Sequence, residues 1–381
     1  MNSKERVRAA IRRERPDKVP LGFYVVDYDT IERVIERPTY VRNKAKAQLA
    51  FWEGRRDEVV ESYKHDTVEF YRKIDLADLI CFKEAPLVPP KGYKPEDPPR
   101  QISDETWEDA EGRIYQISHI SNELVCVHDP TIWQREYTVE EFQAPVNDAP
   151  PDPSIFEACD YLVEQLGQER YIAGSSGGLG AMLLLGGMER GLMEYLLHPE
   201  VVHAALRQGV KRRNLNDKYY IRPGQDGVLF EEDMASTKGP MMSPAMFRDF
   251  CFPGLRERVD NVKRWQVQVL MHNCGNNRAL MDQFIEAGIE CYQSLQANAD
   301  MEVADLKANY GDKMAFWGGV SVDSLVQGTP DAVRQEVRNA LESGAPRGGF
   351  ILGPSHSIAK GTKYENFMAL LDEFDRLRDR Y

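Results

Sequence analysis

Short apolar runs alternate with longer amphipathic segments, and this alternation constrains the fold more than any other feature of the sequence. Each run is bounded by glycine, proline or a polar cluster, as buried parallel strands are. Eight strands alternating with helices predict an α/β fold, a (β/α)8 TIM barrel, although a doubly wound sheet alternates in the same way. The runs are Val19–Val26, Leu76–Phe82, Tyr171–Ala173, Gly227–Phe230, Val267–Met271, Ile289–Tyr292, Met314–Trp317 and Gly349–Leu352.

The segments between the runs carry helix signals, most clearly in the C-terminal half. Thr329 is a suitable N-cap, and Pro330 follows it at the first helical position. Gly344 stands where such a helix ends. The apolar stripe expected of this helix is Val333, Val337, Ala340 and Leu341.

Residues 84–153 do not fit a single crossover between strands. They open with the proline-rich EAPLVPPKGYKPEDPP, and TWEDAEGRIYQISHI then predicts a hairpin that turns at Glu111-Gly112. We interpret the stretch as an insertion after the second strand that covers one mouth of the barrel. The expected organisation is one barrel domain over residues 1–381 with this insertion at about 84–153.

Charge and composition exclude several classes of partner. The chain has 48 basic and 61 acidic residues, a net charge of −13, so phosphate backbones are repelled and nucleic acid is not an expected partner. No apolar run approaches the roughly 20 residues of a membrane helix. The N-terminus lacks a secretory signal, and the six cysteines are expected to be free thiols. We therefore predict a cytoplasmic protein with no membrane partner.

The residues that follow each run are the first candidates for a site, because TIM-barrel active sites lie at the C-terminal ends of the strands. His272-Asn273-Cys274 follows the fifth run directly, and side chains at i and i+2 of an extended chain project to the same side. Imidazole and thiolate are zinc ligands, and catalytic zinc sites use three protein ligands and one open position. His356, after the eighth run, could supply the third ligand.

Three acidic residues after the fourth run could add to such a site. One of Glu231, Glu232 and Asp233 could be a fourth ligand or activate a bound group. The alternative interpretation is structural: His272 would be an ordinary polar residue at a strand end and Cys274 a small buried one. The spacing alone leaves both interpretations open.

Several stretches are similar to one known family. They are ERVRAAIRRERPDKVPLGFY, GGMERGLMEYLLHPEVVHAAL, EEDMASTKGPMMSPAMFRDFCFPGLRERVD, HNCG, FWGGVSVDSLVQGTPDAVRQEV and GGFILGPSHSIAKGTKYENFMALL. On these stretches the chain resembles the uroporphyrinogen decarboxylase superfamily, and within it the corrinoid-dependent methyltransferases. The resemblance covers nearly the whole chain apart from the insertion, and it implies the TIM barrel.

Within the resemblance, two reactions can be distinguished by sequence, decarboxylation and methyl transfer. Decarboxylases of the superfamily carry an arginine-rich segment after the first strand, and this chain has GFYVVDYDT there, without arginine. The methyltransferase branch binds zinc through His-x-Cys after the fifth strand and a cysteine near the end of the eighth. His272 and Cys274 match that pattern, and His356 replaces the cysteine.

The resemblance therefore implies a zinc-dependent methyltransferase of the O-demethylase type. It would demethylate a small methylated donor, above all a methoxylated aromatic, and pass the methyl group to cob(I)alamin. We find no Asp-x-His-x-x-Gly cobalamin segment, so the cobalamin is expected on a separate corrinoid protein. The resemblance also suggests a homodimer.

Catalytic and substrate-binding roles follow from this chemistry. Zinc would stabilise the leaving oxygen, and Glu232 or Asp233 would protonate it. The candidate substrate-binding residues are Tyr24, Asp27, Phe230, Gln293 and Trp317, of which the three aromatic ones would line a pocket. The alternatives are methyl transfer from cobalamin to a thiol or folate, a decarboxylase of the superfamily, and a non-catalytic binder of a corrinoid protein.

Overall fold

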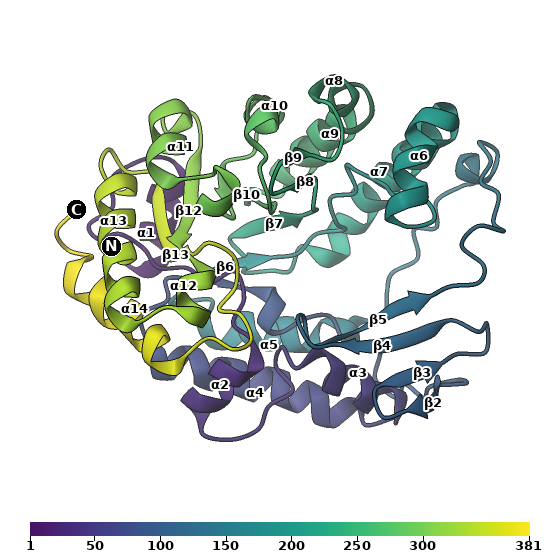
Figure 1. Ribbon diagram of the computed structural model, residues 1–381, viewed down its shortest axis with the longest axis horizontal. Helices are drawn as coiled ribbons and strands as arrows, with labels where there is room; N and C mark the ends of the chain where they lie inside the picture. Colours follow the sequence, from purple (N-terminus) through teal and green to yellow (C-terminus); the bar gives the residue numbers. More distant parts are fainter.

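The computed structural model describes residues 1–381, apart from the side chain of Glu84. Its centre is a curled sheet of seven parallel strands in the order β1-β6-β7-β10-β11-β12-β13 (Figure 1). The order follows the chain, as in a barrel built from successive βα units. The strands are β1 Leu79–Cys81, β6 Tyr171–Gly174, β7 Gly227–Glu231, β10 Gln268–His272, β11 Cys291–Gln293, β12 Ala315–Val320 and β13 Phe350–Pro354.

The segment at Leu21 and Gly22 lies between the two edge strands of this sheet. Parallel bridges pair Leu21 with Leu352 of β13 and Gly22 with Leu79 of β1. The N–H of Gly22 donates to the carbonyl of Leu352 at 2.9 Å, and the N–H of Leu79 donates to that of Leu21 at 3.0 Å. The first run of the sequence thus closes the sheet, which confirms the predicted (β/α)8 barrel.

Helices surround the barrel. Helix α13 shows the predicted punctuation, since the Thr329 hydroxyl accepts the N–H of Ala332 at 3.3 Å and Pro330 is the first helical residue. Its predicted stripe is buried. The α-helices are α1 Ser3–Ile11, α2 Tyr28–Ile35, α3 Lys44–Trp52, α4 Arg56–Ile74, α5 Glu157–Leu166, α6 Met188–Leu197, α7 Pro199–Tyr220, α8 Pro244–Met246, α9 Phe252–Lys263, α10 Met281–Ala287, α11 Val303–Tyr310, α12 Val322–Gln327, α13 Pro330–Gly344 and α14 Tyr364–Leu377.

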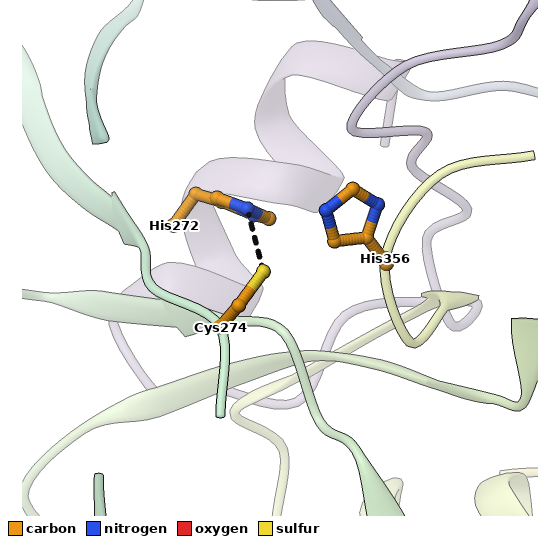
Figure 2. A group of neighbouring side chains, drawn as sticks. All are labelled: His272, Cys274 and His356. Carbon is orange, nitrogen blue, oxygen red and sulfur yellow. Dashed lines mark hydrogen bonds between the residues drawn. The ribbon is translucent and has the colours of Figure 1, made fainter. Parts of the chain in front are cut away.

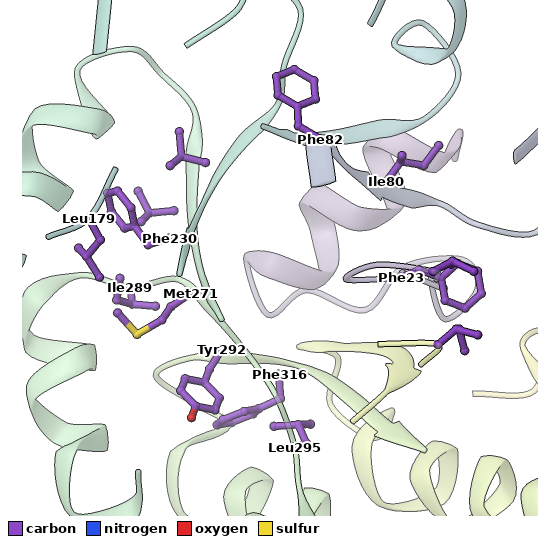
Figure 3. Close-up of a cluster of buried hydrophobic side chains, with 14 of the residues drawn as sticks. Phe23, Ile80, Phe82, Leu179, Phe230, Met271, Ile289, Tyr292, Leu295 and Phe316 are labelled. Atoms are coloured by element: carbon purple, nitrogen blue, oxygen red, sulfur yellow. The ribbon is translucent and has the colours of Figure 1, made fainter. Parts of the chain in front are cut away.

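Side chains alternate along each strand between the barrel interior and the helix layer. Leu270 and Trp317 belong to the interior cluster, which α1 closes at the N-terminal ends of the strands. There Arg6 pairs with Asp78 at 2.7 Å, just before β1. The neighbouring positions along the strands face the helices (Figure 3) and include Ile80, Phe230, Met271, Tyr292 and Phe316.

The stretch predicted as an insertion, residues 84–153, contains a sheet of its own. A four-stranded antiparallel sheet lies between β1 and β6 in the chain, and its β3–β4 hairpin turns at the expected Gly112, where φ is +76°. Lys360, in the loop after β13, donates to the carbonyl of His119 at 3.1 Å, so the insertion meets the C-terminal end of the barrel. Its strands are β2 Arg100–Ser103, β3 Thr106–Glu108, β4 Ile114–Ser118 and β5 Glu123–His128, and a separate small hairpin is formed by β8 Ala235–Ser236 and β9 Gly239–Pro240.

None of the helices in the described part of the chain combines the length and the apolar character needed to cross a membrane.

Candidate metal centre

Three side chains with metal-binding atoms meet at the C-terminal end of the barrel. His272 is the last residue of β10, Cys274 follows two positions later, and His356 lies just beyond β13 (Figure 2). Their ligand atoms all lie within 4.8 Å of one another, and Cys274 Sγ is 3.2 Å from His272 Nε2. The structure therefore brings together the three residues that the sequence predicted as metal ligands.

Hydrogen bonds outside the cluster engage Nδ1 of each imidazole, so Nε2 is the nitrogen left to face the cluster. His272 Nδ1 bonds to Oε1 of Gln293, and His356 Nδ1 lies 3.0 Å from Oγ of Ser357. An amide oxygen only accepts, so the proton of His272 is on Nδ1 and Nε2 keeps its lone pair. Metal-binding histidines are commonly oriented in this way, through a hydrogen bond from the nitrogen that does not bind the metal.

Burial keeps all three side chains neutral in the absence of a cation. It lowers the pKa of His272 to about 3, with a smaller contribution from the neighbouring His356. It also lowers the pKa of His356 and raises that of the Cys274 thiol to about 12, where the charge of Asp233 adds to the effect. A divalent cation reverses this balance at the cysteine, because it favours the thiolate.

The spacing of the cluster fits a zinc ion. With Zn–N near 2.0 Å and Zn–S near 2.3 Å, the edges of a tetrahedral site are about 3.3–3.8 Å long. The separation of His272 and Cys274 is close to such an edge, and the 4.8 Å limit on the others means that His356 would move by at most about 1.5 Å. Two nitrogens and one sulfur leave the fourth position for an external ligand.

Two of the three acidic residues after β7 lie at this cluster. Glu231 belongs to the inward-facing positions, and its Oε2 is 2.5 Å from Nζ of Lys83. Its Oε1 is buried and has no hydrogen-bond partner among the described side chains and backbone. The carboxylate of Asp233 lies close enough to Cys274 and His356 to influence the pKa of both. Glu231 is the last residue of β7, and Asp233 follows it two positions later. The side chains of both lie at the cluster, whereas the side chain of the residue between them points elsewhere.

Glu232, predicted as a proton donor at the metal, points away from the cluster. Its carboxylate accepts the backbone N–H of Met182 at 2.7 Å. Burial raises the pKa of Glu232 to about 7, while the bond from Met182 and the positive charge of Arg213 oppose the rise. These contacts place the carboxylate of Glu232 at the loop that follows β6, and its role as proton donor at the metal stays a prediction.

Tyr24 packs against the cluster, as expected from its position after the first strand. Its ring stacks on His272, with centroids 3.8 Å apart, and meets His356 edge-on at 5.4 Å. The carboxylate of Asp27, the other candidate in this segment, already accepts hydrogen bonds from neighbouring residues. It accepts from Arg42 at 3.1 Å and from the N–H of Lys360 at 3.0 Å, so it fixes the surrounding loops.

The other predicted substrate-binding residues do not face open space. Phe230 is 1% exposed and belongs to the helix-facing core. Trp317 is fully buried inside the barrel, where its Nε1–H donates to the carbonyl of Gly22 at 3.0 Å. Gln293 is also fully buried, with its amide on His272. The structure does not bring Phe230 and Trp317 to an open pocket, because both aromatic rings are packed within the core.

A cavity of about 300 Å³ lies beside the cluster, at the ends of β1, β6 and β7. Cys81, Phe82 and Leu229 give it an apolar wall, and Lys83 and Glu231 give it a charged one. The glycine-rich stretch 174–178 completes the lining. Sequence analysis missed Lys83, although its position directly after the second run was a usable signal.

Comparisons with known proteins agree with this architecture. The family model described as uroporphyrinogen decarboxylase (URO-D) matches residues 125–377. The chloroplastic uroporphyrinogen decarboxylase of Nicotiana tabacum is 24% identical over 224 residues, which are 56% of this chain and 55% of that protein. The uroporphyrinogen decarboxylase of Xanthomonas oryzae pv. oryzae is 26% identical over 153 residues, covering 38% and 42%. The chain thus spans about half the length of the curated relatives it matches.

A solved structure extends the likeness to the whole chain. A methyltransferase from Methanosarcina mazei superposes with a TM-score of 0.66 over 99% of both chains, at 18% sequence identity. At that identity the likeness shows a common fold.

Proposed function

The chain belongs to the uroporphyrinogen decarboxylase family, and from this premise we propose that it is a zinc-dependent methyltransferase. It demethylates a small methylated donor, above all a methoxylated aromatic, and the methyl group passes to the cob(I)alamin of a separate corrinoid protein. The observation that supports the proposal is the two-nitrogen, one-sulfur cluster of His272, Cys274 and His356 at the active end of the barrel.

His272, Cys274 and His356 would hold the metal through Nε2, Sγ and an imidazole nitrogen. When bound there, zinc supplies a Lewis acid that stabilises the negative charge developing on the leaving oxygen. A corrinoid held by the partner protein would supply the nucleophile that accepts the methyl group, and the oxygen left by the broken methyl–oxygen bond would take up a proton. We assign Asp233 to pass that proton from solvent to the oxygen, because its carboxyl group is exposed and lies at Cys274.

The cavity beside the cluster is the proposed donor site. Its size is at the lower end of the range for small-molecule pockets, which suits a single substituted ring. Phe82 and Leu229 offer the apolar surface that a ring requires, and Lys83 can face a polar substituent. Glu231 lines the cavity and also lies next to Tyr24, so a donor in the cavity would have its reacting end near the cluster.

The partner protein and the oligomeric state are part of the same proposal. A corrinoid protein would dock at the C-terminal end of the barrel, where the insertion and the cavity lie. We also propose a homodimer in the cytoplasm.

A transfer assay tests the proposed reaction. The purified, zinc-loaded protein is mixed with a corrinoid protein reduced to Co(I) and a panel of methoxylated aromatics, and methylcobalamin absorbance is recorded. We expect its appearance with at least one donor, and its loss in Asp233→Asn at unchanged zinc content. The result against the proposal is no methylation with any donor, together with demethylation of added methylcobalamin by a thiol.

A further inference from the structure

The end of β11 lies between the two segments that carry the metal ligands. The N–H of Asn273, between His272 and Cys274, donates to the carbonyl of Gln293 at 3.2 Å. The side chains of Gln293 and Ser294 then reach the loop of His356 on the other side. Both are fully buried, although glutamine and serine are usually found at the surface.

Gln293 contacts both histidine-bearing segments with one amide group. Its Oε1 accepts the Nδ1–H of His272, and its Nε2 lies 3.5 Å and 3.4 Å from the carbonyl oxygens of Pro354 and His356. The acceptor and the donor of the amide are thus divided between the two segments. Exchanging them would place Nε2–H against Nδ1–H, so the observed arrangement selects the His272 tautomer with a free Nε2.

Ser294 joins the cysteine to the same loop. Its hydroxyl donates to the carbonyl of Ser355 at 2.9 Å, and its Oγ lies 3.7 Å from Cys274 Sγ. The backbone φ of Ser294 is +93°, a conformation that residues other than glycine rarely adopt. Such strain persists where surrounding contacts fix the residue, and these contacts are at the cluster.

We propose that Gln293 and Ser294 are positioning residues that hold the three ligands in a metal-binding arrangement before the metal arrives. Gln293 fixes the donor nitrogen of His272 and the loop of His356, and Ser294 sets the separation of Cys274 from that loop. The inference rests on the proposed metal site. It replaces the predicted substrate-binding role of Gln293, whose amide is fully engaged.

Zinc affinity tests the proposal, measured on the full chain by competition with a chromophoric chelator. Gln293→Leu is expected to weaken zinc binding by about 10–100-fold, the usual effect of losing such a partner. Gln293→Glu keeps an acceptor for the Nδ1–H of His272, so it should recover most of the loss. Gln283→Leu is the matched control, because Gln283 is a buried glutamine on α10 that donates to the carbonyl of Pro244. It should bind zinc like the wild type.

The Co(II)-loaded protein gives a second readout, which does not depend on activity. Ser294→Ala is expected to shift the thiolate-to-cobalt charge-transfer band, because it removes the hydroxyl beside Cys274. If Gln293→Leu does not fold, Gln293→Glu at wild-type affinity and a shifted band in Ser294→Ala would support the proposal. Wild-type affinity in Gln293→Leu with an unshifted band in Ser294→Ala would overturn it and leave the metal site standing. A folded wild type that binds no zinc would overturn both.

Discussion

The phenol ring of Tyr24 lies parallel to the imidazole of His272, with centroids 3.8 Å apart and an interplanar angle of 6°. One face of the His272 imidazole is therefore covered by an aromatic ring from the segment that closes the barrel. The hydroxyl of Tyr24 lies near Glu231, and burial together with that carboxylate raises the pKa of Tyr24. Tyr24 thus links the proposed metal site to the wall of the cavity.

Two substitutions of Tyr24 distinguish the stacking of its ring on His272 from the contact of its hydroxyl with Glu231. Tyr24→Leu removes the stacking and leaves space beside His272, and we expect it to lower the unfolding free energy by about 1–3 kcal/mol. Tyr24→Phe keeps the ring, so it should remain within about 1 kcal/mol of the wild type. Denaturant unfolding of both variants measures the difference. Equal losses of unfolding free energy in the two variants would show that the stacking of Tyr24 on His272 does not stabilise the fold.

Glu232 should make the stability of the protein depend on pH. Burial raises the pKa of Glu232 to about 7 in the folded chain, against 4.5 for a free glutamate side chain. Between these values the unfolded chain loses the proton first, so this carboxyl destabilises the fold as the pH rises from 4.5 to 7. The penalty above pH 7 is about 3 kcal/mol, from 1.36 kcal/mol per unit.

Glu232→Gln removes that titration and keeps an oxygen for the N–H of Met182. We expect the variant to match the wild type near pH 4.5 and to exceed it at pH 8. Urea unfolding at the two pH values, without zinc, tests this. If the difference in unfolding free energy between wild type and variant is the same at both pH values, the account is contradicted.

Lys83 should affect the donor more than the fold. Lys83 and Glu231 are 43% and 24% exposed, and partly exposed ion pairs contribute about 0.2–1 kcal/mol to stability. Lys83→Met should therefore change the melting behaviour little, keep the zinc and raise the KM for the donor by about tenfold. Steady-state kinetics and zinc content together check this. An unchanged KM would place the donor outside the cavity.

Trp317 should show the opposite pattern. Trp317→Phe leaves a void inside the barrel and loses the bond to the carbonyl of Gly22, at an expected cost of about 2–4 kcal/mol. The KM for the donor should stay within about twofold, because the buried ring does not reach the cavity. A large rise in KM in a stable Trp317→Phe variant would restore its predicted substrate role.

The barrel could be predicted from the sequence because its strands are short, apolar and sharply bounded. The runs at Tyr171, Gly227 and Phe350 become strands within a residue or two of their expected limits. The grouping of the three candidate ligands could be predicted for a related reason. His272 and Cys274 have the i, i+2 spacing that keeps both on one side of the chain, and the eighth run ends close to His356.

The direction of individual side chains could not be predicted in the same way. Buried parallel strands are apolar on both faces, so nothing in the sequence of β7 shows whether Phe230 or Leu229 faces the barrel interior. The same ambiguity assigned the catalytic role to Glu232 and left the inward-facing Glu231 without one. Gln293 faces inward as expected, but its partner His272 is on a neighbouring strand, and only the register of β10 and β11 brings the two together.

Metal content, by elemental analysis, tests the central claim most directly. The samples are the wild type, the ligand variants His272→Ala, Cys274→Ser and His356→Ala, and the controls Cys126→Ser and His128→Ala, which alter exposed residues of β5. The account predicts about one zinc per chain in the wild type and the controls, and its loss from each ligand variant. A folded wild type that holds no zinc after supplementation, or ligand variants that all retain it, would contradict the account.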